Sequence, residues 1–253
     1  MTTKFLDRRE AGQRLAQELN AYRDRTDVLV LALPRGGVPV AAQVAKILKT
    51  PLNVFVVRKL GVPGQAELAM GAIASGGVRV LNAEVVDALA ISADVIDAIT
   101  VEEQRELEQR ERAYRDERPA PEVEGKTVIA VDDGIATGAT MIAAVAALRQ
   151  LKAARVVVAA PAIAASTYYR IRRLADDVAA VIVSEPFHGV GQWYQDFAQT
   201  TDAEVRQLLS EFTPSQVGGS VRKKGPLFRN GCAEGPANGG RRSACNSGHG
   251  MTE

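Results

Sequence analysis

The segment from residue 128 to residue 148 joins a predicted buried strand to a predicted helix through an acidic turn. Residues 128–131 are apolar and mostly β-branched, which is typical of a strand in a parallel sheet covered on both faces. Asp132 and Asp133 follow where this strand ends. Ligands of open α/β sheets bind at the carboxyl ends of strands, so both acids are candidate site residues. Because adjacent carboxylates repel each other, the pair indicates a cation or a hydrogen-bonding diol between them.

The turn after the two acids has the composition of an anion-binding loop. Residues 134–140 read Gly-Ile-Ala-Thr-Gly-Ala-Thr and open the predicted helix. A helix N-terminus offers backbone N–H groups to a phosphate, and Gly134 and Gly138 allow the main chain to curl around it. Thr137 and Thr140 can add hydroxyl donors. An ordinary strand–helix junction capped by a single Asp matches this pattern poorly, since it explains neither the second acid nor the second glycine.

Residues 132–140 resemble the phosphoribosyl-pyrophosphate (PRPP) motif of type I phosphoribosyltransferases. The resemblance implies that Asp132 and Asp133 are the catalytic residues, which bind the ribose hydroxyls and act indirectly, through the bound ribose, on Mg²⁺. It implies that the following loop binds the 5′-phosphate through Ala136, Thr137, Gly138, Ala139 and Thr140. The phosphate loop of nucleoside triphosphatases and the Gly-x-Gly-x-x-Gly fingerprint of dinucleotide-binding proteins are both missing from the sequence.

A second glycine-rich turn, Pro34-Arg35-Gly36-Gly37, follows the first predicted strand. Its position resembles the pyrophosphate loop of the same family, which implies that Arg35, Gly36 and Gly37 bind pyrophosphate. Arg35 would offer a planar fork of donors to phosphate oxygens. Lys59 closes the next predicted strand and could neutralise the leaving pyrophosphate. The alternatives are a plain glycine-rich turn and, for Lys59, a cation whose stem covers the edge of the sheet.

Aromatic residues gather after the last predicted strand, between residues 187 and 197. Aromatic rings at the carboxyl end of a strand suit stacking on a flat base. In the family this place forms a hood over the acceptor, so the predicted acceptor-binding residues are Phe187, Val190, Trp193 and Tyr194. For Trp193 and Phe197 the alternative is a small aromatic core. Salvage enzymes for 6-oxopurines carry a third acid three residues after the pair, where this chain has Ala136. That departure weakens a hypoxanthine or guanine assignment and leaves adenine-like, pyrimidine and non-nucleobase acceptors open.

Apolar runs alternate with helical patterns along most of the chain. Asp7 is predicted to cap a first helix and Asp202 a last one. Gly76-Gly77 lies between two apolar segments and predicts a hairpin. The order predicts an α/β fold with a mostly parallel central sheet and helices on both faces. The resemblance to type I phosphoribosyltransferases implies a small hood region in addition. The predicted strands are 28–33, 52–57, 128–131, 155–160 and 178–183, and the helices between them are 38–48, 139–151 and 166–175.

Residues 59–125 occupy the place of the family's flexible segment, which closes on the substrate. Residues 61–67 are predicted to form a loop, and residues 102–118 are dense in charge. Pairs such as Glu106 with Arg110 and Glu108 with Arg112 are spaced four residues apart, which favours a solvated helix with weak ion pairs. The other interpretation is a lid over the site.

Composition divides the 253-residue chain into a predicted domain, residues 1–213, and a glycine-rich basic tail, residues 214–253. The tail is predicted to be disordered because it has few large apolar residues. It holds Cys232, Cys245 and His249, whose spacing matches no standard zinc site. The net charge of +1 does not favour nucleic acid, and no apolar run is long enough to span a membrane. We expect a cytoplasmic protein and a homodimer.

The resemblance therefore implies a glycosyltransferase of the phosphoribosyltransferase type, with Mg²⁺ as cofactor. It would move 5-phosphoribosyl from PRPP to an unidentified acceptor and release pyrophosphate. The alternative is a regulatory protein that binds PRPP or a nucleotide without turnover. A phosphosugar hydrolase is less favoured, because the sequence has no Gly-x-Ser-x-Gly motif and no metal-binding histidine cluster.

Overall fold

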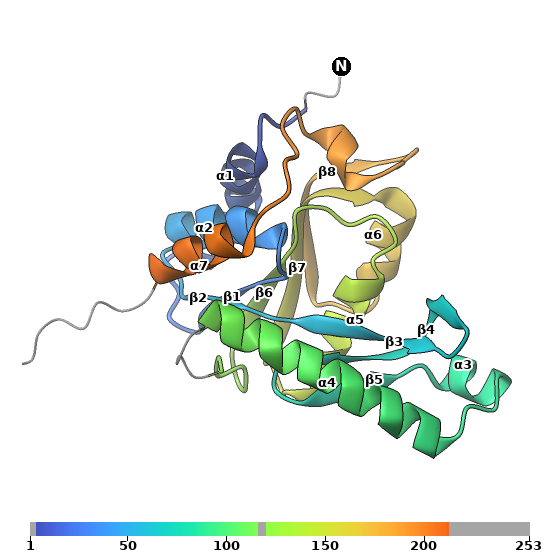
Figure 1. Cartoon of the computed structure of the whole chain (residues 1–253). Coiled ribbons are helices and arrows are strands. Elements are labelled where there is room, and N and C mark those ends of the chain that lie inside the picture. Colours follow the sequence, from blue (N-terminus) through green and yellow to red (C-terminus); the bar gives the residue numbers. More distant parts are fainter. Residues whose placement is uncertain (1–3, 116–119, 213–253) are drawn as a thin grey trace, which may run out of the picture. The chain divides into compact units, whose positions relative to one another are not determined.

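A five-stranded parallel sheet lies at the centre of the fold (Figure 1). The computed structural model describes residues 4–115 and 120–212. The strand order is β2-β1-β6-β7-β8, and each neighbouring pair is parallel. The strands are β1 (Val28–Ala32), β2 (Leu52–Val54), β6 (Thr127–Val131), β7 (Arg155–Ala164) and β8 (Asp177–Ser184). Their carboxyl ends lie along one edge, so the segments that follow β1, β6, β7 and β8 meet there.

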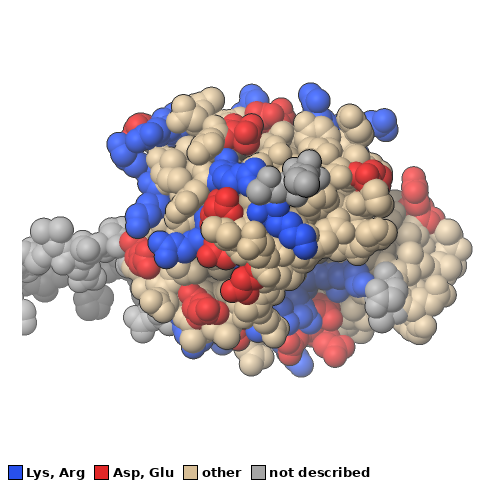
Figure 2. Space-filling model, turned by 90° about the horizontal axis from the view of Figure 1, so that it is seen from above, with Lys and Arg blue, Asp and Glu red and all other residues tan. Residues whose placement is uncertain are grey.

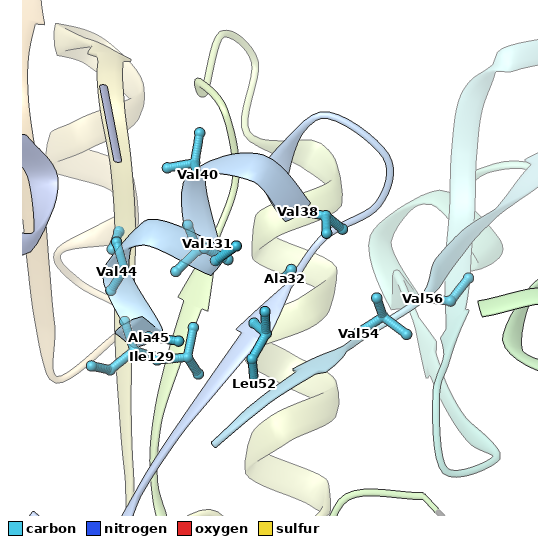
Figure 3. Close-up of a cluster of buried hydrophobic side chains, with 14 of the residues drawn as sticks. Ala32, Val38, Val40, Val44, Ala45, Leu52, Val54, Val56, Ile129 and Val131 are labelled. Atoms are coloured by element: carbon cyan, nitrogen blue, oxygen red, sulfur yellow. The ribbon is translucent and has the colours of Figure 1, made fainter. Parts of the chain in front are cut away.

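Helices cover both faces of this sheet, as Figure 1 shows. On one face lie α1 (Arg8–Glu18), α2 (Gly37–Leu48) and α7 (Asp202–Ser210), and on the other lie α5 (Ala139–Gln150) and α6 (Ala165–Ile171). Side chains alternate along each strand: Ile129 and Val131 pack toward α2, whereas Val128 and Ala130 pack toward α5. Figure 3 shows the first of these layers, where valines of α2 lie over β1, β2 and β6. The predicted fold class is confirmed.

The first helix begins where the sequence predicts, because the Asp7 carboxylate accepts a hydrogen bond from the backbone N–H of Glu10 (2.8 Å). The predicted cap of the last helix is wrong by one residue. Thr201 caps α7, and the Glu204 carboxylate accepts a hydrogen bond from the Thr201 backbone N–H. A Thr followed three residues later by Glu forms a reciprocal capping box, which satisfies two helix-end N–H groups. Asp202 is therefore the first helical residue rather than the cap.

A second, antiparallel sheet consists of β3 (Val57–Val62), β4 (Gln65–Ala74) and β5 (Val78–Leu81). The hairpin at Gly76-Gly77 is confirmed, and both glycines have positive φ angles, 86° and 74°. The loop predicted over 61–67 is wrong, since only residues 63 and 64 turn between β3 and β4. The strand predicted over 52–57 ends at Val54. Lys59 consequently lies on β3, opposite Ala72, and not at the end of a strand of the main sheet.

Helices α3 (Ala83–Ala88) and α4 (Ala93–Arg115) follow the small sheet. Helix α4 buries Ile96, Leu107 and Tyr114 against the core, so it is solvated on one side only. Arg58 of β3 is 2.6 Å from Glu103 of α4, an ion pair that fixes the helix to the small sheet. A closing motion of residues 59–125 stays a prediction.

The face seen in Figure 2 mixes both signs of charge. Lys and Arg side chains are interspersed with Asp and Glu across it. Within residues 4–115 and 120–212, no helix is both long and apolar enough to cross a membrane. The predicted tail, with Cys232, Cys245 and His249, lies outside the described residues, and its predicted disorder stays a prediction.

Candidate active site

The two predicted anion loops pack directly against each other at the carboxyl edge of the main sheet. The first follows β1 and the second follows β6. A Cβ atom on Gly36 would collide with the Asp133 carboxylate and lie 2.6 Å from its Cγ. One on Gly37 would lie 2.7 Å from the Val131 carbonyl oxygen. Only glycine allows this approach. The peptide bond between Pro34 and Arg35 is cis.

Strand β7 holds the loop after the acid pair in place. The N–H of Ile135 donates to the Ala162 carbonyl, and the N–H of Ala164 donates to the Ile135 carbonyl, both at 2.9 Å. Gly138, the N-cap of α5, has a φ of 74°, which favours glycine. These constraints give the loop one shape without a ligand.

Helix α6 and the residues around it bind the carbonyl side of the same loop. The Thr167 hydroxyl donates to the Ala136 carbonyl (2.6 Å), and the Arg170 guanidinium donates to the Thr137 carbonyl. The C=O and N–H of a trans peptide point in opposite directions. The N–H groups of Thr137 and Gly138 are therefore turned away from α6, as an anion-binding loop requires.

The acid pair is electrostatically strained and partly neutralised. Asp132 is half-buried, and its Oδ1 accepts a hydrogen bond from the N–H of Asp133 (2.8 Å). The pKa of Asp132 is raised well above its ordinary value, mainly by burial and in second place by the negative charge of Asp133. Arg8 opposes this shift: its Nε donates to Asp133 Oδ2 at 2.8 Å, with the two side chains 12% and 13% exposed.

Arg8 reaches the site from α1, 125 positions before Asp133 in the sequence. Its guanidinium carbon lies 4.0 Å from the centre of the Phe197 ring, and its Nη1 donates to the Ala198 carbonyl (2.6 Å). The sequence prediction missed Arg8, because nothing local to α1 indicates a site. Arg8 comes close to the acid pair only in the folded protein, through the order of the strands in the sheet and the path of the chain after β8.

Two of the predicted acceptor-binding residues lie in an aromatic cluster. Tyr194 is 3% exposed, packs 5.5 Å from Phe5 between ring centres, and donates its hydroxyl to the Asp133 carbonyl (2.6 Å). The pKa of Tyr194 is raised, mainly by burial and in second place by the negative charge of Asp133. Trp193 is 8% exposed and packs 5.8 Å from Phe187. The burial favours the aromatic-core interpretation of Trp193. Tyr194 is also buried, and its hydrogen bond supports the backbone of the acid pair.

The other two predicted acceptor-binding residues lie beside the phosphate loop. Val190 packs on Gly134, where a Cβ atom would collide with the Val190 side chain. Phe187 lines a cavity of about 530 Å³ that also borders the loop. The cavity walls are Ala136, Thr137, Ala164, Ser166, Thr167, Arg170, Glu185 and Phe187. Ser166, Arg170 and Glu185 were missed in the sequence, although they follow β7 and β8 at the same edge.

The residues predicted to bind pyrophosphate are less tightly grouped. Gly36 and Gly37 touch the acid pair, whereas Arg35 is exposed, with its Nη1 3.9 Å from Asp202 Oδ1. Lys59 is an exposed residue of the small sheet. Pyrophosphate binding by these residues stays a prediction.

The carboxylates available to a metal ion are those of Asp132 and Asp133. Within the described part of the chain, no group of three or more His, Cys, Asp or Glu side chains could hold a metal ion. Mg²⁺ commonly uses one or two carboxylates together with water and substrate phosphates. The pair therefore fits an ion held mainly by substrate oxygens, and does not fit an ion caged by protein alone.

Comparison with known proteins gives relatives along most of the chain. Two curated proteins from Mycobacterium tuberculosis, strains CDC 1551 / Oshkosh and ATCC 25618 / H37Rv, each carry the name "Putative phosphoribosyl transferase". Each is 46% identical over 205 residues, which are 81% of this chain and 46% of the relative. The chain thus spans about half the length of these relatives.

A crystal structure of the protein TT1426 from Thermus thermophilus has the same fold. Its TM-score is 0.76 at 38% identity, and the match covers 84% of this chain and 100% of that chain. A family model described as a phosphoribosyl transferase domain matches residues 64–193, just over half of the chain. That stretch includes the acid pair, the loop held by β7 and the aromatic segment as far as Trp193, and the chain belongs to the phosphoribosyl transferase domain family.

Proposed function

We propose that the protein transfers a 5-phosphoribosyl group from PRPP to an acceptor and releases pyrophosphate. The observation that carries the proposal is the contact between the glycine loop at Gly36 and the carboxylate of Asp133. Two loops suited to anions therefore flank one acid pair. PRPP has the matching order of groups, with a 5′-phosphate and a pyrophosphate on either side of a ribose diol.

In the proposed reaction the acid pair accepts hydrogen bonds from the ribose hydroxyls. The N–H groups of Thr137 and Gly138 bind the 5′-phosphate at the start of α5. Displacement at the anomeric carbon develops positive charge on the ribose, which the carboxylates stabilise. Arg35 leaves its exposed position near Asp202 to bind the departing pyrophosphate.

Mg²⁺ is the proposed cofactor. When bound, it would supply positive charge to the leaving group. Asp132 and Asp133 would orient it through the bound ribose. A cytoplasmic location and a homodimer remain expectations from the sequence.

Pyrophosphate release tests the proposal. Protein, Mg²⁺ and PRPP are mixed with a panel of purine, pyrimidine and other nitrogen acceptors. We expect release with at least one acceptor, and its loss in Asp132→Asn/Asp133→Asn with the fold retained by circular dichroism. Glu84→Gln/Asp87→Asn removes the same charge from exposed positions of α3 and is the control. Release that survives in the acid-pair variant would show that the pair is structural.

A regulatory protein that binds PRPP or a nucleotide without turnover is the second candidate. It is favoured by Ala136, which lines the cavity and occupies the loop position where the 6-oxopurine enzymes carry a third acid. This position therefore offers no carboxylate that could take a proton from an acceptor. Calorimetry decides between the two candidates. Binding of PRPP without pyrophosphate release from any acceptor would favour the regulatory protein.

A further inference from the structure

The cavity beside the phosphate loop has one basic and one acidic side chain, Arg170 and Glu185, among its lining residues. Arg170 lies at the loop end, where its guanidinium binds the Thr137 carbonyl and approaches Gly138. Its positive charge therefore lies on the carbonyl side of the loop, near the start of α5. Glu185 lies at the hood end, directly after β8.

Glu185 brings a carboxylate to the wall formed by the hood. The Ser166 hydroxyl donates to Glu185 Oε1 at 3.4 Å, a long hydrogen bond that leaves the second carboxylate oxygen for other donors. Phe187, two residues further along the chain, lines the same cavity and is half-buried against Trp193. The wall therefore joins a ring face to a hydrogen-bond acceptor that carries negative charge.

The phosphate loop contributes no acid to the cavity at position 136. Ala136 lines the cavity with a methyl group, so the loop side offers no carboxylate at that position. Among the described lining residues, Glu185 is the only acid. Any discrimination by negative charge in this cavity has to come from the hood side.

We propose that Glu185 selects the acceptor, admitting a planar nitrogen heterocycle that presents N–H donors and rejecting one that carries a carboxylate. The ring stacks on Phe187, and an amino or ring N–H group donates to the free oxygen of Glu185. An anionic ring would meet the negative charge of Glu185, and this repulsion costs binding energy. This inference rests on the proposed function, because phosphoribosyl transfer is what requires an acceptor ring to bind beside the ribose phosphate.

Mononucleotide binding tests the selectivity without a known acceptor. The probes are ribose 5-phosphate, which has no base, adenosine 5′-monophosphate, which has an amino group, and orotidine 5′-monophosphate, which has a carboxylate on its base. Trp193 is the only tryptophan of the chain and packs 5.8 Å from Phe187, so its fluorescence reports on this wall. The variants are Glu185→Gln and, as control, Glu124→Gln, an exposed acid paired with Lys152.

In the wild type and in Glu124→Gln we expect the adenine nucleotide to bind more tightly than ribose 5-phosphate, and the orotate nucleotide more weakly. Glu185→Gln should reduce the preference for adenine over orotate about tenfold, the size expected when one charge-assisted hydrogen bond is lost. Its affinity for ribose 5-phosphate should not change.

Two outcomes would overturn the proposal, and they differ. Binding of ribose 5-phosphate with an unchanged nucleotide preference in Glu185→Gln would reject selection by Glu185 and leave the proposed function standing. A wild-type protein that binds no ribose 5-phosphate would reject the proposed function and this inference with it.

Discussion

Arg8→Met removes the positive charge against the acid pair while leaving an unbranched chain to cover the Phe197 ring. The ion pair of Arg8 with Asp133 is 2.8 Å long, and both side chains are about one-eighth exposed. Exposed ion pairs contribute about 0.2–1 kcal/mol, and breaking a fully buried one costs about 3–5 kcal/mol. This pair lies between the two limits. We therefore expect the free energy of unfolding at pH 7 to fall by about 2 kcal/mol.

Urea and thermal denaturation measure this loss. A fall of about 2 kcal/mol corresponds to a melting temperature lower by roughly 4–8 °C in a domain of this size. Arg14→Met is a matched control on the same helix. Arg14 also stacks on a ring, that of Phe5 at 4.8 Å, but its ion pair with Glu10 is 3.8 Å long and about one-third exposed. Its replacement should cost less than about 1 kcal/mol.

A double-mutant cycle with Asp133→Asn isolates the pair itself. We expect a coupling energy of about 1–2 kcal/mol between positions 8 and 133. Two results would refute the assignment of Arg8 as the partner of the acid pair. One is that the free-energy losses of the two single substitutions simply add. The other is that Arg8→Met lowers the free energy of unfolding no more than Arg14→Met does.

The pH dependence gives the same reasoning a second measurement. The pKa of Asp132 is raised above its ordinary value of 3.8, chiefly by burial. Between that value and the folded pKa, the folded protein holds a proton that the unfolded chain has lost, so stability falls as the pH rises. The charge of Arg8 lowers the folded pKa. Without it the window extends upward, and the deficit of Arg8→Met should be larger at pH 8 than at pH 5.

Two further substitutions act on the acid pair directly. Asp132→Asn removes the group with the raised pKa, so the variant lacks the loss of stability that the wild type suffers as the pH rises. The melting temperature of the variant minus that of the wild type should therefore increase from pH 4.5 to pH 8. A constant difference would show that Asp132 titrates normally. Gly36→Ala places a methyl group against the Asp133 carboxylate and should weaken ribose 5-phosphate binding at least about tenfold, measured by calorimetry. Gly189→Ala, where a Cβ atom meets nothing within 4 Å, is its control; equal affinities would contradict the close packing.

The main sheet was predictable because its signals are local. Strand β6 occupies Thr127–Val131, against a prediction of 128–131, since a run of apolar β-branched residues bounded by charge has few other structures. The hairpin at Gly76-Gly77 followed from two consecutive residues suited to positive φ. The acid pair and its loop were recognised for the same reason, as their residues are contiguous.

Contacts between distant segments were not predictable in the same way. Arg8 and Asp133 are 125 positions apart, and only the folded sheet and α1 bring them together. Strand β3 was missed because Arg58, Lys59 and Gly61 interrupt its apolar pattern, and its strand character comes from pairing with β4. Glu185 has no local signal, because its significance depends on the cavity that residues after β6 and β7 form with it.

One carboxyl oxygen connects the glycine loop after β1 to the long helix over the small sheet. Asp202 Oδ1 accepts a hydrogen bond from the Tyr114 hydroxyl of α4 (2.8 Å) and lies 3.9 Å from Arg35 Nη1. Both Arg35 and Asp202 are substantially exposed, so an anion can draw Arg35 away at small energetic cost. Asp202 is then left to Tyr114 alone. We therefore predict that occupancy of the loop and attachment of α4 are linked equilibria, in which reciprocity requires each to change the other by the same factor.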